Sequence, residues 1–398
     1  MSALVLVFWG ATAFIVWTYA VFPLLLAVRA LRPLPRPSGA GPLPRVSLLI
    51  VAHNEAAVIG DKLANLEALD YPRDRLQVII ASDGSDDGTN ERVAAHAGAT
   101  GVSLLALDRI GKNAALNAAA AKADGEILVF SDADSALEPD AMRRLVAPFA
   151  DPGVGAVAGD FRYHAEGGEG RGERSYWRMD RVWRRLESRA GSATSATGQL
   201  HAIRRELFSP VPVGVTDDFY VSTAAIDAGL RLWFEPGAVA RGPVTATPDA
   251  EFRRKVRLIG RGFASVWARR RLLDPRRTGF YAIQLLSHKV MRRLVGAPLV
   301  LLAISSPLLW NEHAIHRLAT VAQLVFHGLA LAGLSLRRRA VGRAPVFALP
   351  LAFDAANAAG LVALVDFMRG EVARDWVPER QGHGAAEVPI PPPTPEEA

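Results

Sequence analysis

The middle of the chain alternates continuously apolar segments with segments of helical periodicity. The apolar segments are Val46–Ala52, Leu76–Ser82, Val102–Leu107 and Glu126–Phe130, and the helical ones are Ala56–Leu69, Glu91–Ala97 and Lys112–Ala123. Apolar strands joined by helices are typical of parallel strands that are covered on both faces. The pattern therefore predicts an α/β fold: a mostly parallel sheet with helices on both faces, and ligands at the carboxyl ends of the strands.

The N-terminal segment is apolar over a longer stretch. Met1 to Val28 include no charged residue, and about 20 apolar residues in a helix suffice to cross a bilayer. No basic residue precedes this segment, and it is too long for the core of a signal peptide. We therefore expect a transmembrane helix over residues 1–31, kinked at Pro23, rather than a cleaved leader. A Pro-rich linker over residues 32–44 follows.

Three further apolar segments predict a C-terminal transmembrane region over residues 294–368. They are Leu294–Trp310, about Leu318–Leu336, and Ala344–Met368. The first two predict a hairpin of spans, with a short turn between them. The third contains Asp354, Asn357 and Asp366, so it is compatible with a span, an interfacial helix or a helix packed inside the bundle. The tail, residues 369–398, ends in a Pro- and Glu-rich stretch that is typical of disorder.

Basic residues mark one side of these segments. They are Arg29, Arg32 and Arg36 after the first segment, Arg292 and Arg293 before the hairpin, and Arg337, Arg338 and Arg339 after it. Because positively charged loops stay on the cytoplasmic side, the pattern predicts a multi-pass protein of the cell membrane (plasma or inner membrane). The N-terminus would lie outside, and a domain over residues 45–250 would lie in the cytosol.

Residues 251–293 are strongly basic. Thirteen Lys and Arg side chains stand between Arg253 and Arg293, opposed over this region only by Glu251 and Asp274. Basic residues that adjoin membrane spans meet anionic lipids, each contributing about 1 kcal/mol near the surface. We therefore expect basic amphipathic, interfacial helices that contact anionic membrane lipids, and no binding of nucleic acid. The helical spacing of apolar residues over Phe280–Leu294 supports this expectation.

Composition narrows the possible chemistry. The 398 residues are 50% hydrophobic, carry a net charge of +6 and include no cysteine. The absence of cysteine excludes disulfides, thiolate zinc sites, iron–sulfur clusters and cysteine nucleophiles. High hydrophobic content with a low net charge per residue excludes disorder for most of the chain.

Polar residues follow the predicted strands. His53, Asn54 and Glu55 come after the first strand, and Asp83-Gly84-Ser85-Asp86-Asp87-Gly88-Thr89 follows the second. Such residues are equally typical of turns and helix caps, so each motif alone is compatible with a structural or a ligand-binding role. Neither the dinucleotide-binding nor the P-loop glycine pattern is present.

Asp132-Ala133-Asp134 follows the fourth strand. Two carboxylates with this spacing project the same way, and they repel each other unless a cation lies near them. Oxygen ligands of this kind suit Mg²⁺ or Mn²⁺ shared with phosphate oxygens. The alternative is a solvated acidic turn that caps the next helix.

Two further sites stand at helix starts. Lys112 opens a helix, where the helix dipole favours an anion, so an anionic ligand would explain both features. A tolerated surface lysine is the alternative. Asp217 and Asp218 open a later helix, with Thr216 as its expected cap. A first-turn acidic pair without further role remains the alternative there.

Taken together and in order, these motifs resemble those of a known enzyme family. They are Ala52-His53-Asn54-Glu55, Asp83-Gly84-Ser85 with Asp87-Gly88-Thr89, Gly111-Lys112-Asn113-Ala114-Ala115-Leu116-Asn117, Asp132-Ala133-Asp134 and Thr216-Asp217-Asp218. The chain resembles the family 2 glycosyltransferases, inverting enzymes with the GT-A fold. The similarity is to the membrane-integrated branch related to cellulose, chitin, hyaluronan and poly-N-acetylglucosamine synthases, and it covers about residues 45–270.

The resemblance implies a role for each matching residue. The nucleotide-sugar donor would be bound by His53, Asn54, Glu55, Asp83, Gly84, Lys112 and Asp132. Asp134, with Asp132, would hold Mg²⁺ or Mn²⁺. Asp218 would be the general base, with Asp217 beside it where many members carry Glu. Gly198 and Gln199 would border the acceptor, and Arg257 and Arg261 would approach the diphosphate.

One motif of the processive members is missing. They carry Gln-x-x-Arg-Trp after the base, whereas Arg253–Gly262 here contain neither Gln nor Trp. We therefore expect a metal-dependent, hexosyltransferase-type enzyme that adds one or a few sugars from a nucleotide-diphospho-sugar, expected to be a UDP-sugar. The acceptor would be a lipid-linked or polysaccharide hydroxyl.

Three alternatives stay open. They are a processive polysaccharide synthase, a nucleotidyltransferase, and a non-catalytic membrane scaffold with a decayed transferase domain. The sequence does not identify the sugar, the acceptor, the protein partners or the oligomeric state.

Overall fold

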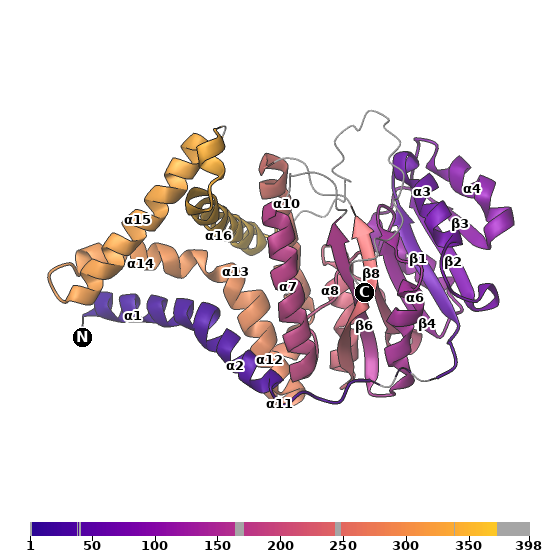
Figure 1. The fold of residues 1–398 in the computed structure, drawn as a ribbon, viewed down its shortest axis with the longest axis horizontal. Coiled ribbons are helices and arrows are strands. Elements are labelled where there is room, and N and C mark those ends of the chain that lie inside the picture. The colour runs from indigo at the N-terminus through magenta and orange to yellow at the C-terminus, as the bar shows by residue number, and fades with distance from the viewer. Residues whose placement is uncertain are drawn as a thin grey trace.

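The computed structural model describes residues 2–37, 39, 41–163, 171–242, 248–337 and 339–371. It has an α/β part built on a single sheet and, beside it, a group of long apolar helices (Figure 1). The helices α7 (Arg171–Ala190) and α10 (Pro248–Ala268) stand between the two. The expected tail, residues 369–398, lies outside the described residues from residue 372 onward.

The sheet contains eight strands in the order β3-β2-β1-β4-β7-β6-β8-β5. Their bounds are β1 Val46–Ala52, β2 Leu76–Asp83, β3 Val102–Leu107, β4 Ile127–Asp132, β5 Ala136–Leu137, β6 Val154–Tyr163, β7 His201–Arg204 and β8 Arg231–Gly242. The first four strands are mutually parallel, whereas β7 runs antiparallel to both β4 and β6. The carboxyl ends of β1, β2, β3 and β4 therefore lie along one edge.

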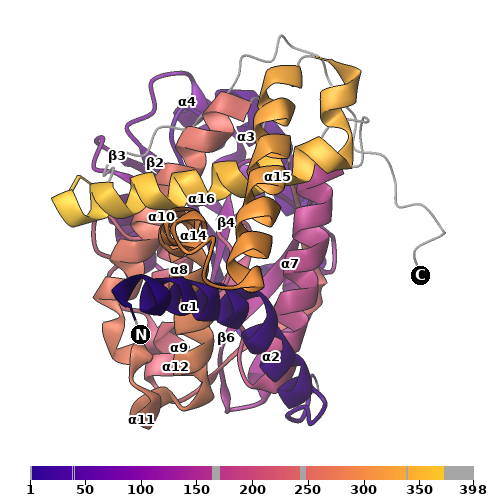
Figure 2. The same ribbon diagram turned by 90° about the vertical axis from the view of Figure 1, so that its left-hand side faces the viewer.

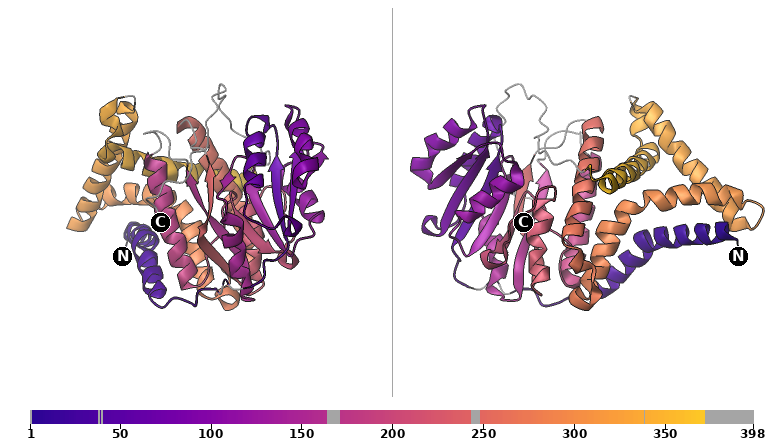
Figure 3. Two further views of the ribbon diagram at one scale, coloured as in Figure 1. Left: turned by 45° about the vertical axis from the view of Figure 1, so that its right-hand side comes forward. Right: turned by 180° about the vertical axis from the view of Figure 1, so that it is seen from behind.

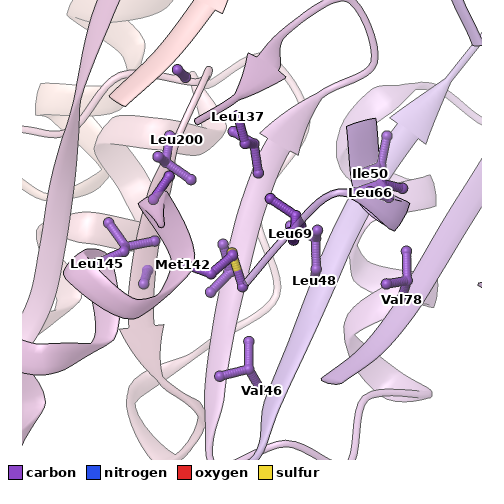
Figure 4. Close-up of a cluster of buried hydrophobic side chains, with 14 of the residues drawn as sticks. Val46, Leu48, Ile50, Leu66, Leu69, Val78, Leu137, Met142, Leu145 and Leu200 are labelled. Atoms are coloured by element: carbon purple, nitrogen blue, oxygen red, sulfur yellow. The ribbon is translucent and has the colours of Figure 1, made fainter. Parts of the chain in front are cut away.

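Side chains on β1 alternate between two cores. Leu48 and Ile50 pack with residues of α3 (Ala56–Glu67) and α6 (Ala141–Val146), as Figure 4 shows for part of this cluster. Leu49 and Val51 pack on the other face with α5 (Lys112–Ala121). Because side chains of a strand point alternately to opposite faces, a strand buried on both faces is apolar at nearly every position.

The remaining helices of this part are short or peripheral. They are α4 Thr89–Thr100, α8 Asp217–Ser222, α9 Ala224–Asp227 and α11 Pro275–Thr278, with 3₁₀ turns at Arg73–Arg75, Ala147–Ala150, Arg205–Leu207 and Arg270–Leu273. A further 3₁₀ turn, Ala340–Arg343, joins the last two apolar helices. The four predicted strands and the mixed α/β architecture are confirmed. The four later strands make the sheet mixed rather than mostly parallel beyond β4.

Three helices among the described residues are long and apolar enough to cross a membrane: residues 3–30, Ala314–Leu336 and Pro345–Arg369. The first consists of α1 (Ala3–Val16), a π-helical segment (Trp17–Val21) and α2 (Phe22–Ala30). At the position where a kink was expected from Pro23, the helix contains this π-helical segment. Proline lacks an N–H and its ring crowds the carbonyl four residues earlier, which falls on Tyr19 within the segment.

The next apolar region differs from the predicted span at Leu294–Trp310. Helix α14 covers only Gly296–Leu308, about 20 Å, which is too short to cross alone. Only together with Phe280–Leu294 is it long and apolar enough to cross a membrane, and the two segments are bent by 56° relative to each other. The latter contains α12 (Phe280–Leu285), a π-helical segment (Leu286–Met291) and α13 (Arg292–Leu294). The segment expected to be an interfacial helix leading into the bilayer is therefore one half of a bent pair, which is compatible with a broken span or a re-entrant loop.

The last two helices pack on each other through a polar pair. In α16 (Pro345–Arg369), Asp354 lies 2.9 Å from His327 of α15 (Ala314–Leu336). Of the three alternatives for this segment, the pair favours packing inside the bundle on at least one face. Helix α1 lies beside α14, and α16 crosses close to α10 (Figures 2 and 3).

The N-terminal helix is attached to the bent pair and to α7 by specific contacts. The Trp17 indole N–H donates to Ser287 Oγ at 2.9 Å. Arg29 Nε donates to the Ala190 carbonyl at 3.0 Å, and its guanidinium lies over the Phe280 ring. The linker continues this contact, since Leu34 N–H donates to the Arg189 carbonyl at 3.0 Å.

Truncating a side chain in the sheet core should destabilise the α/β part. Leu48 is fully buried, so Leu48→Ala should lower the free energy of unfolding by about 2–5 kcal/mol through lost burial and the cavity left behind. Thermal unfolding of the detergent-solubilised protein measures the change. Val213→Ala, at a position that is 70% exposed, is the control and should leave the midpoint almost unchanged. Equal midpoints for the two variants would contradict this picture of the core.

Candidate active site

The loops after β1 and β2 are joined by hydrogen bonds. His53 Nδ1 lies 2.8 Å from the Asp83 carbonyl oxygen, and Asn54 N–H donates to Ser85 Oγ. Asn54 adopts a left-handed backbone conformation (φ 54°), which lets its side chain accept from Asp86 N–H. Glu55 is buried, and its N–H donates to Thr89 Oγ1. The residues on these loops that were predicted to bind the nucleotide-sugar donor are therefore brought together at the carboxyl edge of the sheet.

Asp83 organises the loop that precedes α5. Its carboxylate is fully buried and accepts from Ile110 N–H at 2.7 Å, from Gly111 N–H at 2.9 Å and from Arg109 at 2.6 Å. The Arg109 backbone can come this close to β2 because residue 84 is a glycine. A Cβ at that position would lie only 2.8 Å from the Arg109 backbone nitrogen. The effect of these contacts is to fix the start of α5, and with it Lys112.

Lys112 connects the two acidic motifs. Its ammonium lies 3.2 Å from Asp132 Oδ1 and 3.3 Å from Asp217 Oδ2. Burial alone would lower the pKa of Lys112, but Asp132 and Asp217 outweigh burial and raise it. The lysine is therefore always charged. The anions expected to compensate a lysine at a helix start are, in this structure, the protein's own carboxylates.

The Asp132 and Asp134 carboxylates have the chemistry of a small metal site. Burial raises the pKa of Asp134, and the negative charge of Asp132 raises it further, so a cation between them would be stabilising. Among the described residues, no group of three or more His, Cys, Asp or Glu side chains could hold a metal by itself. Mg²⁺ or Mn²⁺ can be bound by two carboxylates when phosphate and water oxygens fill the remaining coordination positions of the metal.

Gly198 borders Asp132. A Cβ at Gly198 would lie 3.3 Å from Asp132 Oδ2, so a side chain there would crowd that carboxylate. Next to it, Gln199 Oε1 is buried without a hydrogen-bond partner among the described residues. A buried unpaired acceptor is costly, and a bound ligand with a hydroxyl group would satisfy it. Of the two residues expected at the acceptor side, Gly198 thus adjoins Asp132, and Gln199 follows it in the chain.

Asp217 and Asp218 begin helix α8. Thr216 occupies the cap position, but it forms no side-chain cap, which corrects the expected role. Its N–H donates to Ser265 Oγ of α10 at 2.8 Å instead, and the two hydroxyl groups lie 3.1 Å apart. Asp218 Oδ1 accepts from the Phe219 N–H at 2.7 Å. Helix α8 is therefore anchored to α10, the helix that packs on α16.

The two neighbouring aspartates have opposite pKa shifts. Burial raises the pKa of Asp218, and the charge of Asp217 raises it further. Burial also acts on Asp217, but Lys112 and then His201 outweigh it, so the pKa of Asp217 is lowered. Adjacent acids whose environments separate their pKa values can serve different roles in proton transfer. Asp217 is held ionised, and Asp218 is the better proton acceptor.

Two buried side chains at the site were not anticipated from the sequence. His201 is fully buried, stacks on Phe130 and has Nε2 unpaired among the described residues. Lys62 of α3 is 3% exposed, and its ammonium donates to Ser131 Oγ at 2.8 Å and to the Ser135 carbonyl at 2.5 Å. Burial lowers the pKa of Lys62 to about 8, against the opposing charges of Asp132 and Asp134. A lysine on the apolar face of a helix is the signal that could have revealed it.

The arginines expected near the diphosphate lie on α10. Arg261 is one turn before Ser265, which bonds its carbonyl oxygen, and Arg257 is one turn earlier still. Both arginines thus lie on the helix to which the start of α8 is hydrogen-bonded.

A mixed sheet with acidic motifs at its carboxyl edge is the arrangement that the resemblance to glycosyltransferases implies. Residues 47–211 match the family model described as glycosyl transferase family 2. The chain therefore carries a family 2 glycosyltransferase domain, as the resemblance predicted.

Relatives and a solved structure agree with this assignment. A beta-monoglucosyldiacylglycerol synthase from Synechocystis is 33% identical over 38% of this chain and 34% of its own. An N-acetylglucosaminyltransferase from Azorhizobium caulinodans is 26% identical over 53% of this chain and 57% of its own. The chain thus spans about a third to just over half of the length of these relatives.

The structural similarity covers more of the molecule. The mannosyltransferase PcManGT from Pyrobaculum calidifontis, in complex with GDP-Man and Mn²⁺, is 26% identical. The match has a TM-score of 0.67 and covers 91% of this chain and 98% of that one. It extends beyond the sheet to most of the described helices and confirms the GT-A type of fold.

The lowered pKa of Asp217 predicts a pH-dependent contribution to stability. An acid whose pKa is lower in the folded state stabilises the fold above its unfolded pKa of about 3.9, and this stabilisation is lost as pH falls through the folded value. The difference in thermal midpoint between the wild type and Asp217→Asn should therefore be largest near pH 6 and should shrink below about pH 4. A difference that stays constant between pH 6 and pH 3 would show that Lys112 does not hold Asp217 ionised.

Proposed function

We propose that the protein is a membrane-bound inverting glycosyltransferase. It moves a sugar from a nucleotide-diphospho-sugar to a hydroxyl group of a lipid-linked or polysaccharide acceptor. The observation that carries the proposal is the Lys112 bridge: one ammonium contacts both Asp132, at the donor motif, and Asp217, beside Asp218. The residues that would bind the donor and those that would activate the acceptor thus lie within the length of one lysine side chain.

The donor would occupy the edge formed by β1, β2 and β4. Its nucleoside would lie along the loops of His53, Asn54 and Glu55 and beside Asp83 and Gly84. Asp132 and Asp134 would hold Mg²⁺ or Mn²⁺, which would supply positive charge to the departing diphosphate. Lys112 would add to that charge. We infer a UDP-sugar or, given the GDP-Man complex of PcManGT, a GDP-sugar as donor.

Asp218 would take the proton of the attacking hydroxyl group. Its raised pKa improves it as a base near neutral pH. An inverting transfer is a single in-line displacement, in which the acceptor oxygen bonds the anomeric carbon as the bond to the diphosphate breaks. One acceptor-side base is therefore sufficient. Gly198 and Gln199 would border the sugar or lipid head that carries this hydroxyl group.

The position of the base favours an acceptor held at a membrane. Asp218 lies on α8, which is bonded to α10, and α10 packs along α16, a candidate span. The lack of the Gln-x-x-Arg-Trp motif on α10 favours addition of one or a few sugars over processive synthesis. Basic residues of α10 and of Phe280–Leu294 would contact anionic lipids.

We further propose that the protein lies in the cell membrane, with the catalytic domain on the cytosolic side. The arginines that follow α2 and α15 support this orientation. The bent pair Phe280–Leu294 and Gly296–Leu308 would enter the bilayer from the same side.

A direct assay tests the proposal. Membranes containing the protein, a lipid extract as acceptor and a panel of labelled UDP- and GDP-sugars are incubated with and without Mn²⁺. Transfer of label to a product of defined size from one donor, dependent on the metal, is expected. Long polymers would instead identify a processive synthase. No turnover and no binding of any nucleotide diphosphate would favour the scaffold.

Asp134→Asn should weaken metal-dependent donor binding. It removes one of the two negative charges that would hold the cation while keeping the side chain's shape. The affinity for the nucleotide diphosphate in the presence of Mn²⁺ should fall at least about tenfold, with an unchanged unfolding midpoint. Calorimetry measures this, with Asp124→Asn, an exposed acid on another edge, as the matched control. Equal donor affinity in the two variants would rule out the metal role of Asp134.

Asp218→Asn should separate binding from chemistry. It removes the proton acceptor but not the donor site, so kcat should fall about 10²–10⁴-fold with donor affinity retained. Steady-state transfer and nucleotide binding measure the two quantities. Near-normal turnover would mean that another group accepts the proton.

A further inference from the structure

Lys62 is a buried cation for which the transfer reaction as described has no use. It lies on α3, 3% exposed, and donates to Ser131 Oγ and to the Ser135 carbonyl. These two residues flank Asp132-Ala133-Asp134. A buried ammonium costs several kcal/mol unless it is hydrogen-bonded and compensated by opposite charge, so its placement beneath this motif calls for an explanation.

Helix α3 forms a second pair of hydrogen bonds with the segment that contains the motif. One turn after Lys62, the Asn65 amide donates to the Leu137 carbonyl at 2.7 Å and accepts from the Leu137 N–H at 2.8 Å. Four hydrogen bonds from α3 thus hold the segment from Ser131 to Leu137. The segment is thereby fixed to a rigid helix rather than left as an open turn.

The two acidic side chains receive positive charge from opposite faces of the sheet. Lys112 belongs to α5 and contacts Asp132 from the side of the core that contains Leu116. Lys62 belongs to α3, whose Leu63 lies in the other core. Carboxylates separated by one residue repel each other when ionised, and the two lysines offset this repulsion while no metal is bound.

We propose that Lys62 is a positioning residue that serves as a counter-cation of the Asp132–Asp134 pair. Its bonds to Ser131 and Ser135 hold the segment that carries both carboxylates before a ligand arrives, and its charge weakens their affinity for a metal ion alone. The metal is thereby bound together with the donor, whose diphosphate supplies the missing negative charge. This inference rests on the metal role in the proposed function.

Titration of the full-length, detergent-solubilised protein with Mn²⁺ alone tests this role. Lys62→Gln keeps a hydrogen-bond donor but removes the charge, so it should bind Mn²⁺ about tenfold more tightly than the wild type, because a repelling cation is gone. The electron paramagnetic resonance signal of free Mn²⁺ measures binding without nucleotide or turnover. Mn²⁺ should also raise the thermal midpoint of Lys62→Gln more than that of the wild type.

Three matched variants identify the cause. Ser131→Ala removes one bond to Lys62 but keeps the charge, and Lys62→Arg also keeps it, so both should bind Mn²⁺ as the wild type does. Lys122→Gln removes an exposed lysine and should have no effect. If Lys62→Gln does not fold, the titration is made with Lys62→Met. Failure of both to fold even with Mn²⁺ would overturn the proposal, since Lys62 would then be required for folding alone.

The possible outcomes separate this inference from the proposed function. If Lys62→Gln binds Mn²⁺ no more tightly than a wild type that does bind it, Lys62 is not a counter-cation, and the metal role of Asp134 stands. If Ser131→Ala tightens binding as much as Lys62→Gln, geometry rather than charge is responsible, and the proposal is also wrong. If the wild type binds no Mn²⁺ even with a nucleotide diphosphate, the proposed function itself fails.

Discussion

The site depends on the neutralisation of carboxylates that the fold gathers at one edge of the sheet. Asp132, Asp134, Asp217 and Asp218 come from two distant segments, and their mutual repulsion opposes folding. Lys112 connects the segments by contacting Asp132 and Asp217 at 3.2 and 3.3 Å. Asp83 in turn fixes the start of the helix that carries Lys112. A small set of buried charge contacts therefore determines where donor and acceptor would meet.

Much of the donor half could be predicted from the sequence because it is local. Strands β1, β2 and β4 are mostly apolar, since both of their faces are largely buried, and each motif stands at the end of its strand. The later strands gave no such signal: β6 contains Gly155, Gly159 and Asp160, and β8 contains Pro236 and Gly237. Their positions depend on pairing with distant partners, which periodicity does not reveal.

The acceptor half was harder to predict for the same reason. Thr216 looked like a helix cap, but a partner on α10, Ser265, takes its hydrogen bond. Lys62 and His201 are single polar residues in apolar surroundings, and only tertiary packing shows that they lie beneath the acidic motifs. The broken helix before α14 was likewise not visible from composition, because a bend of 56° changes no residue's polarity.

The bond between Trp17 and Ser287 has a consequence for how substrates arrive. It ties the π-helical turn of the N-terminal helix to the π-helical turn of the broken helix, and Arg29 adds a second fastening at Ala190. The two contacts join the N-terminal helix both to the bent pair and to α7 of the α/β part, so they limit a hinge motion between these parts. In the proposed membrane-bound enzyme, Asp218 would therefore stay at a nearly fixed height above the lipid, and an acceptor would have to reach it by lateral diffusion with its hydroxyl group at that height.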